Sequence, residues 1–222
     1  PNILTDARAV RRRRIRDDLD SLRRFQDPAT ADPVLGADEN YQQALSLVTS
    51  ATAQKAFEIG RESDAVRERF GRNALGQRVL LARRLVEAGV PVVQVLMSAS
   101  DLNGGKGDHW DTHGDNFNRL KKRLLPVFDR GVSALLKDLD DRGRLDETLV
   151  VVLTDFGRTP RINGGAGRDH YPSVYSIALA GGGIQGGQVY GSSDSNGAFP
   201  DTQACGPPDV HAPIFRCLGV SP

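Results

Sequence analysis

The sequence predicts an α/β protein in which helices flank a parallel β-sheet. Three short runs of mostly apolar residues have the length of buried strands, at residues 90–97, 149–154 and 176–180. A helical period of apolar residues fills the interval from about 117 to 142, and strand, helix, strand with near-continuous apolar strands is typical of a parallel sheet covered on both faces. We therefore expect a helical segment over residues 1–89 that packs on a sheet domain over residues 90–222.

The helical segment rests on three stretches with apolar residues at helical spacing. They lie at about residues 15–25, 41–52 and 73–88, and the prolines of the sequence DPATADP separate the first two. Gly89 follows the third stretch in the position typical of a helix C-terminus. The pattern predicts three amphipathic helices whose apolar faces serve packing.

Composition excludes some classes of partner. Lys and Arg number 29 against 28 Asp and Glu, a net charge of +1, so no global field recruits nucleic acid or an anionic membrane. The run RRRRIR is interleaved with aspartates and lacks neighbouring aromatic residues, which favours a solvated face over a nucleic-acid interface. No apolar stretch approaches the ~20 residues of a membrane span. The chain begins without Met or a signal peptide pattern, and we interpret it as truncated or processed.

Glycine and proline mark the boundaries of the sheet domain's elements. Pro126 is expected to kink the helix at 117–142 or to start its second half, and Gly143 to end it. The segment LAGGGIQGG lacks the Lys-Ser/Thr ending of a P-loop and is interpreted as a turn. Cys205 and Cys217 are compatible with one disulfide, but two unrelated small residues are the favoured interpretation.

Two polar loops follow the first two predicted strands. Ligands of parallel sheets bind beyond the carboxyl ends of the strands, so both loops are expected to open on the same edge. If the first loop is extended, Asp111 and His113 point the same way; if it is helical, His109 and His113 share a face. Either pair suits a divalent metal such as zinc. The density of such residues favours a site over helix caps and turns; they are Asp108, His109, Asp111, His113, Asp115, Asp155, Asp169 and His170.

Three arginines bracket the second loop, namely Arg158, Arg161 and Arg168. A guanidinium group suits the paired oxygens of a phosphate, sulfate or carboxylate, and it also neutralises neighbouring carboxylates; the two roles are compatible. Trp110 is either a wall of the site or part of the core.

Several segments closely resemble a bacterial family, the domain of unknown function 1501, which is sulfatase-like and related to the alkaline phosphatase superfamily. The resemblance runs from about residue 38 to the end and is carried by the segments RESDAVRERFGRNALGQRVLLARRLVEAGVPVV, WDTHGDNF, LVVVLTDFGRTPRIN, GRDHYP and LAGGGIQGGQVYGSSD. It implies an alkaline-phosphatase-like sheet, of which this chain is the C-terminal part, and a periplasmic or exported location. By the same resemblance the closing segment is a short helix in which His211 is structural.

The resemblance also implies metal ligands. In that superfamily a strand delivers an Asp-His pair to a metal; here DETLVVVLTDFG supplies Asp155 but has Phe156 in place of the histidine. His170 is similar to the later histidine of the superfamily, and Asp111 with His113 to the earlier pair. The superfamily's first metal-binding aspartate and its nucleophile lie outside this chain, so the catalytic residue is unknown.

Two functions follow as hypotheses. In the first, the complete protein is a metal-assisted hydrolase of small anionic sulfate or phosphate esters, and this fragment alone is inactive. Its divalent metal, zinc, manganese or calcium, is held by Asp111, His113, Asp155 and His170, and its substrate oxygens by Arg158 and Arg168. In the second, the protein is a non-catalytic binder of anionic ligands such as sulfated glycans, which Phe156 supports. The oligomeric state and the substrate are not predicted.

Overall fold

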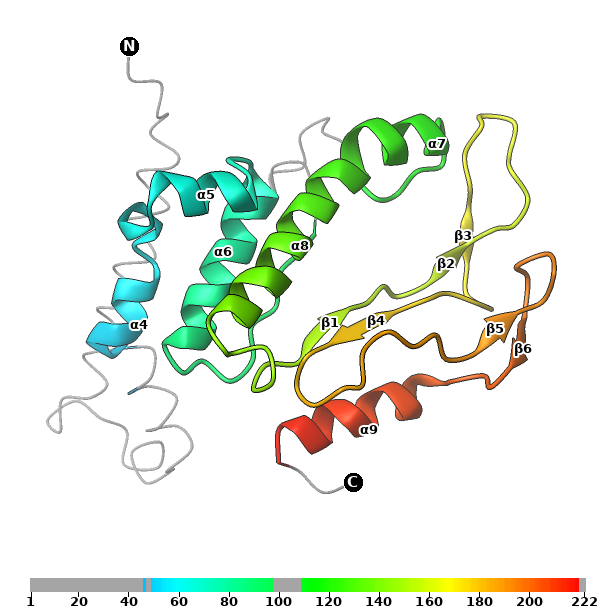
Figure 1. Ribbon diagram of the computed structural model, residues 1–222. Coiled ribbons are helices and arrows are strands. Elements are labelled where there is room, and N and C mark those ends of the chain that lie inside the picture. The colour runs from blue at the N-terminus through cyan, green and yellow to red at the C-terminus, as the bar shows by residue number, and fades with distance from the viewer. Residues whose placement is uncertain (1–45, 47–48, 98–108, 220–222) are drawn as a thin grey trace, which may run out of the picture. The chain divides into compact units, whose positions relative to one another are not determined.

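The computed structural model describes residues 46, 49–97 and 109–219 (Figure 1). The chain forms two compact units: residues 1–59 with 84–93, and residues 60–83 with 94–222. The helix predicted around residues 15–25, most of the helix predicted at 41–52 and Asp108 lie outside the described residues. The predicted division at residue 90 into a helical segment and a sheet domain stays a prediction.

The first unit contains the short helix α4 (Ala51–Ala56). Ser50 begins it as an N-cap, because its hydroxyl accepts the backbone N–H of Ala53 at 3.0 Å. At the other end Arg84 donates to the carbonyl oxygens of Lys55 and Ala56, at 2.6 and 2.7 Å. These bonds hold the guanidinium of Arg84 at the C-terminal end of α4, where helical carbonyl groups point outward.

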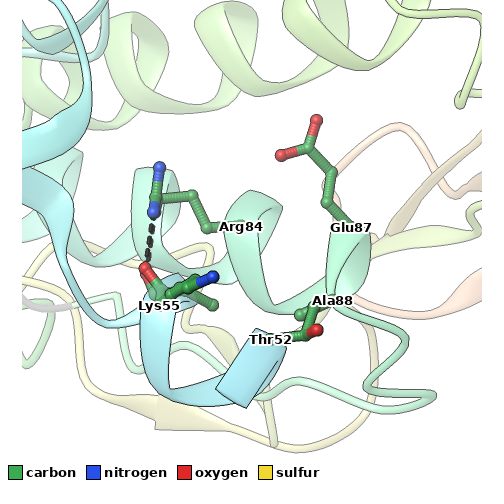
Figure 2. Close-up of a pocket in the computed structure, with 6 residues that line it drawn as sticks. Thr52, Lys55, Arg84, Glu87 and Ala88 are labelled. Atoms are coloured by element: carbon green, nitrogen blue, oxygen red, sulfur yellow. Dashed lines mark hydrogen bonds between the residues drawn. The ribbon is translucent and has the colours of Figure 1, made fainter. Parts of the chain in front are cut away.

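A shallow hollow lies beside this contact (Figure 2). Its volume of about 150 Å³ is below the roughly 300–1,000 Å³ of small-molecule sites. Arg84 crosses it to reach the end of α4. The hollow is therefore part of the helix packing, and its lining is Thr52, Lys55, Ala56, Arg84, Glu87 and Ala88.

The helices that follow α4 in the chain are bounded by local caps and glycines. A single 3-10 turn, η1 (Ile59–Arg61), precedes α5 (Asp64–Phe70), which ends at Gly71 with φ +91°. The next helix, α6 (Ala74–Glu87), confirms the prediction at 73–88, and Gly89 after it has φ +89°. A Cβ on Gly76 would lie 2.0 Å from the carbonyl oxygen of Phe70, so glycine allows the turn between α5 and α6 to close.

The helix predicted at 117–142 is also confirmed, with an irregular start. It consists of α7 (Asn116–Arg119), one π-helical turn η2 (Leu120–Leu124) and α8 (Leu125–Asp141). Pro126 lies at the start of α8, directly after the π-helical turn, so it starts the second half as expected. Gly143, with φ +62°, follows the end of α8.

The core of the second unit is apolar, with one buried ionic network. The largest fully buried apolar side chains are Phe70, Leu75, Leu80, Leu124 and Leu139. Among them, Arg83 is 1% exposed and contacts Glu62 at 2.9 Å and Asp138 at 3.0 Å. Arg142 adds a contact to Asp138 at 2.8 Å. This network joins α6 to α8 and to the segment before α5.

The strands of the described residues form three antiparallel pairs: β1 (Val150–Val152) with β4 (Ala178–Ala180), β2 (Gly157–Arg158) with β3 (His170–Tyr171), and β5 (Ser192–Ser193) with β6 (Pro200–Thr202). The strands predicted at 149–154 and 176–180 are thus confirmed over residues 150–152 and 178–180. They are not fully buried as predicted: β1 is half-buried, and Ala178 of β4 is exposed.

The segment predicted as a strand at 90–97 is irregular, and the prediction of a strand there is wrong for this structure. A strand needs a hydrogen-bonded neighbour, and none of the described residues pairs with this segment. The parallel sheet of an α/β fold stays a prediction.

The last described helix is α9 (Pro207–Cys217), which begins with two prolines in its first turn. The carboxylate of Asp209 accepts the backbone N–H of Gly206 at 2.7 Å and fixes this start. Cys205 and Cys217 are both free and exposed. Across the described ranges, no helix has the length and apolar character that a membrane crossing requires.

Candidate metal centre

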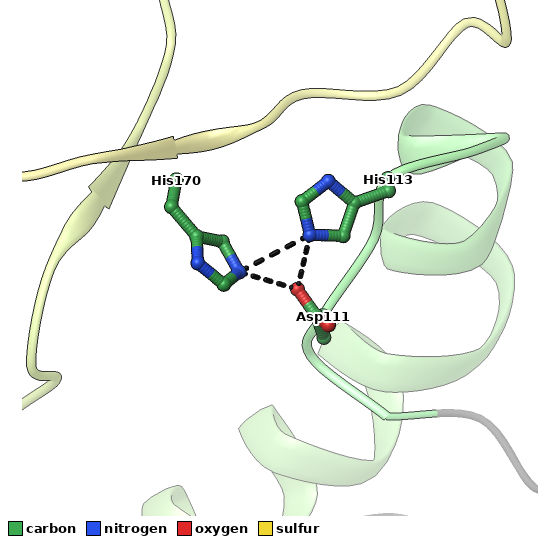
Figure 3. Close-up of side chains that lie close together, drawn as sticks. All are labelled: Asp111, His113 and His170. Atoms are coloured by element: carbon green, nitrogen blue, oxygen red, sulfur yellow. Dashed lines mark hydrogen bonds and ion pairs between the residues drawn. The ribbon is translucent and has the colours of Figure 1, made fainter.

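Three of the predicted metal ligands converge in the second unit (Figure 3). His170 Nε2 lies 2.7 Å and His113 Nε2 lies 2.9 Å from the same oxygen, Oδ1 of Asp111. The two imidazole nitrogens are 3.1 Å apart. One carboxylate oxygen and two imidazole nitrogens therefore occupy the corners of a small triangle.

Two separate segments supply this triangle. Asp111 and His113 lie in the extended segment that leads into α7, and residues two apart in an extended chain point to the same side. His170 belongs to β3, where it is paired with Arg158 of β2. Side chains directly opposite in an antiparallel pair share a face. This explains why Arg158 Nη2 also reaches Asp111 Oδ1, at 3.0 Å.

Backbone hydrogen bonds clasp the two segments together. The loop at 163–168 bonds to the segment at 112–116 through Arg168 N to Thr112 O at 3.2 Å, Asp115 N to Gly165 O at 2.9 Å and Asn116 N to Ala166 O at 3.0 Å. The Thr112 hydroxyl is buried and donates to the side-chain oxygen of Asn116 at 2.5 Å. The separation of His113 and His170 is thus set by main-chain contacts.

Gly167 makes the clasp possible, and its replacement gives a first prediction. A Cβ at this position would lie 1.9 Å from the carbonyl oxygen of His113, so one backbone must move. We expect Gly167→Ala to lower the free energy of unfolding by about 1–3 kcal/mol, the usual cost of an unrelieved steric conflict. Chemical denaturation measures this. The control is Gly164→Ala in the same loop, where a Cβ meets nothing within 4 Å; equal effects of the two variants would contradict the clasp.

An outer layer of side chains supports the histidines. Asp169 Oδ1 lies 2.7 Å from His113 Nδ1, and Asn163 Nδ2 donates to the same oxygen at 3.1 Å. The ring of Phe156 packs against that of His170, with 4.2 Å between centroids and 33° between planes. His113 is therefore held by Asp169 at its other ring nitrogen, and His170 is held by Phe156 along the face of its ring.

The pKa values of two carboxylates in this group are lowered. The hydrogen bond from His170 lowers the pKa of Asp111 to about 2, and the Arg158 guanidinium and the nearby His113 act in the same direction. Hydrogen bonds from His113 and Asn163 lower the pKa of Asp169 below its ordinary value. Both groups are therefore ionised at neutral pH.

The fourth predicted ligand, Asp155, lies outside the triangle. Its Oδ1 accepts the hydroxyl of Thr154 at 3.3 Å and the backbone N–H of Phe156 at 3.1 Å, so the carboxylate is turned toward its own backbone. Among the described residues, the group whose ligand atoms lie close enough to hold one metal ion consists of Asp111, His113 and His170, without Asp155. Its role as a ligand stays a prediction.

The predicted substrate arginines have contacts within the protein. Arg158 donates to Asp111, to the carbonyl oxygen of Trp110 at 2.9 Å and to that of Arg168 at 3.2 Å. The guanidinium of Arg168 lies over the ring of Phe117, 5.5 Å from its centroid. Trp110 packs edge-on against Phe128, with 5.9 Å between centroids, which places it in the packing of the unit.

Two supporting residues were not predicted as such. Asn163 precedes glycines, a pattern that indicates only a turn, and its bonds to His113 and Asp169 depend on segments distant in sequence. Phe156 was interpreted as a substitute for a lost ligand, whereas it packs on His170. The signal in the sequence for this packing role was the position of Phe156, an apolar residue directly after the polar residues that end the strand.

Comparison with known proteins places the chain in one family. The family model described as "Protein of unknown function (DUF1501)" matches residues 1–222, the whole of the chain. Neither the curated proteins nor the solved structures yield a match. Because the family model spans the full length, this chain belongs to the DUF1501 family.

Proposed function

We propose that this chain provides a divalent metal centre, formed by Asp111, His113 and His170, to a hydrolase of sulfate or phosphate esters. The observation that carries the proposal is the convergence of one carboxylate oxygen and two imidazole nitrogens from two distant segments. The ester substrate rests on the resemblance of the sequence to sulfatase-like proteins. The metal centre rests on geometry.

The donor set fits a zinc ion. Two imidazole nitrogens and one carboxylate are a ligand set of catalytic zinc sites. Ligand atoms at 2.0–2.1 Å from a tetrahedral zinc are separated by about 3.3 Å; the three separations here are 2.7, 2.9 and 3.1 Å. Calcium prefers oxygen ligands throughout, and manganese favours carboxylate, carbonyl and water. Of the three metals expected from the sequence, the donors favour zinc.

The exposure of the ligands supports a catalytic role over a structural one. The side chains of His113, His170 and Asp111 are 46%, 48% and 49% exposed. Structural zinc sites are closed by four protein ligands, whereas catalytic sites keep a position open to substrate. When bound, the ion would supply a Lewis acid that stabilises negative charge developing on the ester.

The chain's own side chains orient the ligands. Arg158 holds the carboxylate of Asp111, and its charge helps to keep that carboxylate ionised. Phe156 covers one face of the His170 ring. Arg158 and Arg168 remain the proposed contacts for the anionic oxygens of the substrate. The nucleophile is proposed to lie outside this chain.

Metal content tests the proposal. We expect the chain, purified without affinity histidines and incubated with zinc, to retain one ion per chain by elemental mass spectrometry, and to lose it to a strong chelator. Far less than stoichiometric metal would contradict the proposal. In the protein extended upstream, chelator is expected to abolish turnover of aryl sulfate or phosphate.

A non-catalytic binder of anionic ligands is the second candidate. Phe156, which stands where the wider superfamily has a metal-binding histidine, favours it. Binding of a sulfated glycan that persists in chelator, without ester turnover, would support this candidate against the hydrolase.

A further inference from the structure

We infer that Asp169 is a positioning residue: it accepts the Nδ1–H of His113 and so keeps Nε2 of the same ring turned toward Asp111 and His170. The consequence for metal affinity rests on the proposed metal centre. The orientation of the ring does not, because the metal-free protein already has it.

The contact between Asp169 and His113 fixes the direction of the hydrogen bond. Asp169 Oδ1 lies 2.7 Å from His113 Nδ1. An ionised carboxylate only accepts, so Nδ1 is the donor. Nδ1 is therefore engaged with Asp169, and Nε2 is the ring nitrogen that faces Asp111 and His170.

Asn163 holds Asp169 in place for this role. Its amide nitrogen donates both to Asp169 Oδ1 at 3.1 Å and to the carbonyl oxygen of His113 at 3.0 Å. Its amide oxygen accepts the backbone N–H groups of Gly165 and Gly167 at 3.0 and 2.9 Å. These four bonds leave one orientation for the amide, and they tie the backbone of His113 to the carboxylate that holds its ring.

The orientation of the ring has a consequence for the triangle. His113 Nε2 lies 2.9 Å from Asp111 Oδ1 and 3.1 Å from His170 Nε2, so all three atoms are placed to hold one cation. An outer carboxylate that fixes a ligating histidine is a common feature of metal sites.

The first test is whether Nδ1 of His113 carries a proton that Asp169 holds. Long-range ¹H–¹⁵N spectra of the imidazole are expected to show a hydrogen-bonded Nδ1–H in the wild type. Asp169→Ala is expected to lose this signal. A wild-type His113 whose Nδ1 carries no proton would overturn the inference, as would an unchanged Nδ1 signal in Asp169→Ala.

The second test is zinc affinity, measured by competition with a chelator of known affinity. Asp169→Ala is expected to weaken binding by about 10–100-fold, the usual effect of losing an outer partner. Asp169→Asn is expected to fall between, because its amide keeps the shape but can also donate to Nδ1. The control is Asp201→Ala, an exposed aspartate of β6. Thermal unfolding of each variant verifies that it is folded.

The two proposals fail in different ways. Affinity in Asp169→Ala and Asp169→Asn equal to that of the wild type would overturn the positioning role while leaving the metal centre standing. A wild type that binds no zinc would contradict the metal centre, and the imidazole spectra would still decide the role of Asp169.

Discussion

His170→Ala is expected to lower the affinity for zinc by more than about a hundredfold, since the loss of an outer partner alone costs 10–100-fold. His170 Nε2 makes the shortest contact of the triangle, 2.7 Å to Asp111. Its removal leaves one carboxylate and one imidazole, too few ligands to fix an open zinc site. The side chain is 48% exposed, so the fold is expected to survive. Competition with a chelator measures the affinity.

The matched control for this loss is His211→Ala. His211 is exposed on α9, where its ring packs edge-on near Phe215, outside the triangle. It is expected to leave zinc affinity unchanged. Retention of tight binding by His170→Ala, or equal losses in the two variants, would contradict the proposed centre. Asp155→Ala then tests the predicted fourth ligand. A loss of zinc affinity as large as that of His170→Ala would add Asp155 to the set of ligands.

The convergence of Asp111, His113 and His170 was the part of the site most accessible from sequence. Their loops were expected to meet because polar loops gather at a common sheet edge. Of the two geometries open for the first loop, the structure has the extended one, in which Asp111 and His113 share a side. His109 instead accepts the backbone N–H of Asp111 at 3.2 Å. Residue type and density gave a larger group of candidates, and the family resemblance selected these three together with Asp155.

Strand pairing and side-chain direction were less accessible. An apolar run such as that at 149–154 indicates burial, but it reads the same whether its partner is parallel or antiparallel. The antiparallel register of Val151 with Leu179 depends on where the chain returns, which local spacing does not encode. The orientation of the Asp155 side chain depends on the hydroxyl of the neighbouring Thr154, which donates a hydrogen bond to its carboxylate.

Asp138→Ala is expected to lower the free energy of unfolding by about 3–5 kcal/mol, because it removes one partner of a buried ion pair. Asp138 is 3% exposed, and its carboxylate contacts Arg83 at 3.0 Å and Arg142 at 2.8 Å. Arg83 is itself 1% exposed and would keep its contact with Glu62 but lose the one with Asp138. A buried guanidinium that loses one of its carboxylate partners lowers the free energy of unfolding, because its charge is no longer balanced by that partner. Urea denaturation followed by circular dichroism measures the change.

Asp141→Ala is the control, on the same helix α8. Asp141 is 45% exposed and contacts Lys137 at 2.9 Å, so its loss is expected to cost no more than about 1 kcal/mol, as for other surface pairs. Similar effects of the two variants would show that the buried network contributes no more than a surface pair. The triangle lies before α7 and on β3, and its clasp does not involve Asp138. Zinc affinity of folded Asp138→Ala is therefore expected to match the wild type, which separates the stability of the unit from the chemistry of its site.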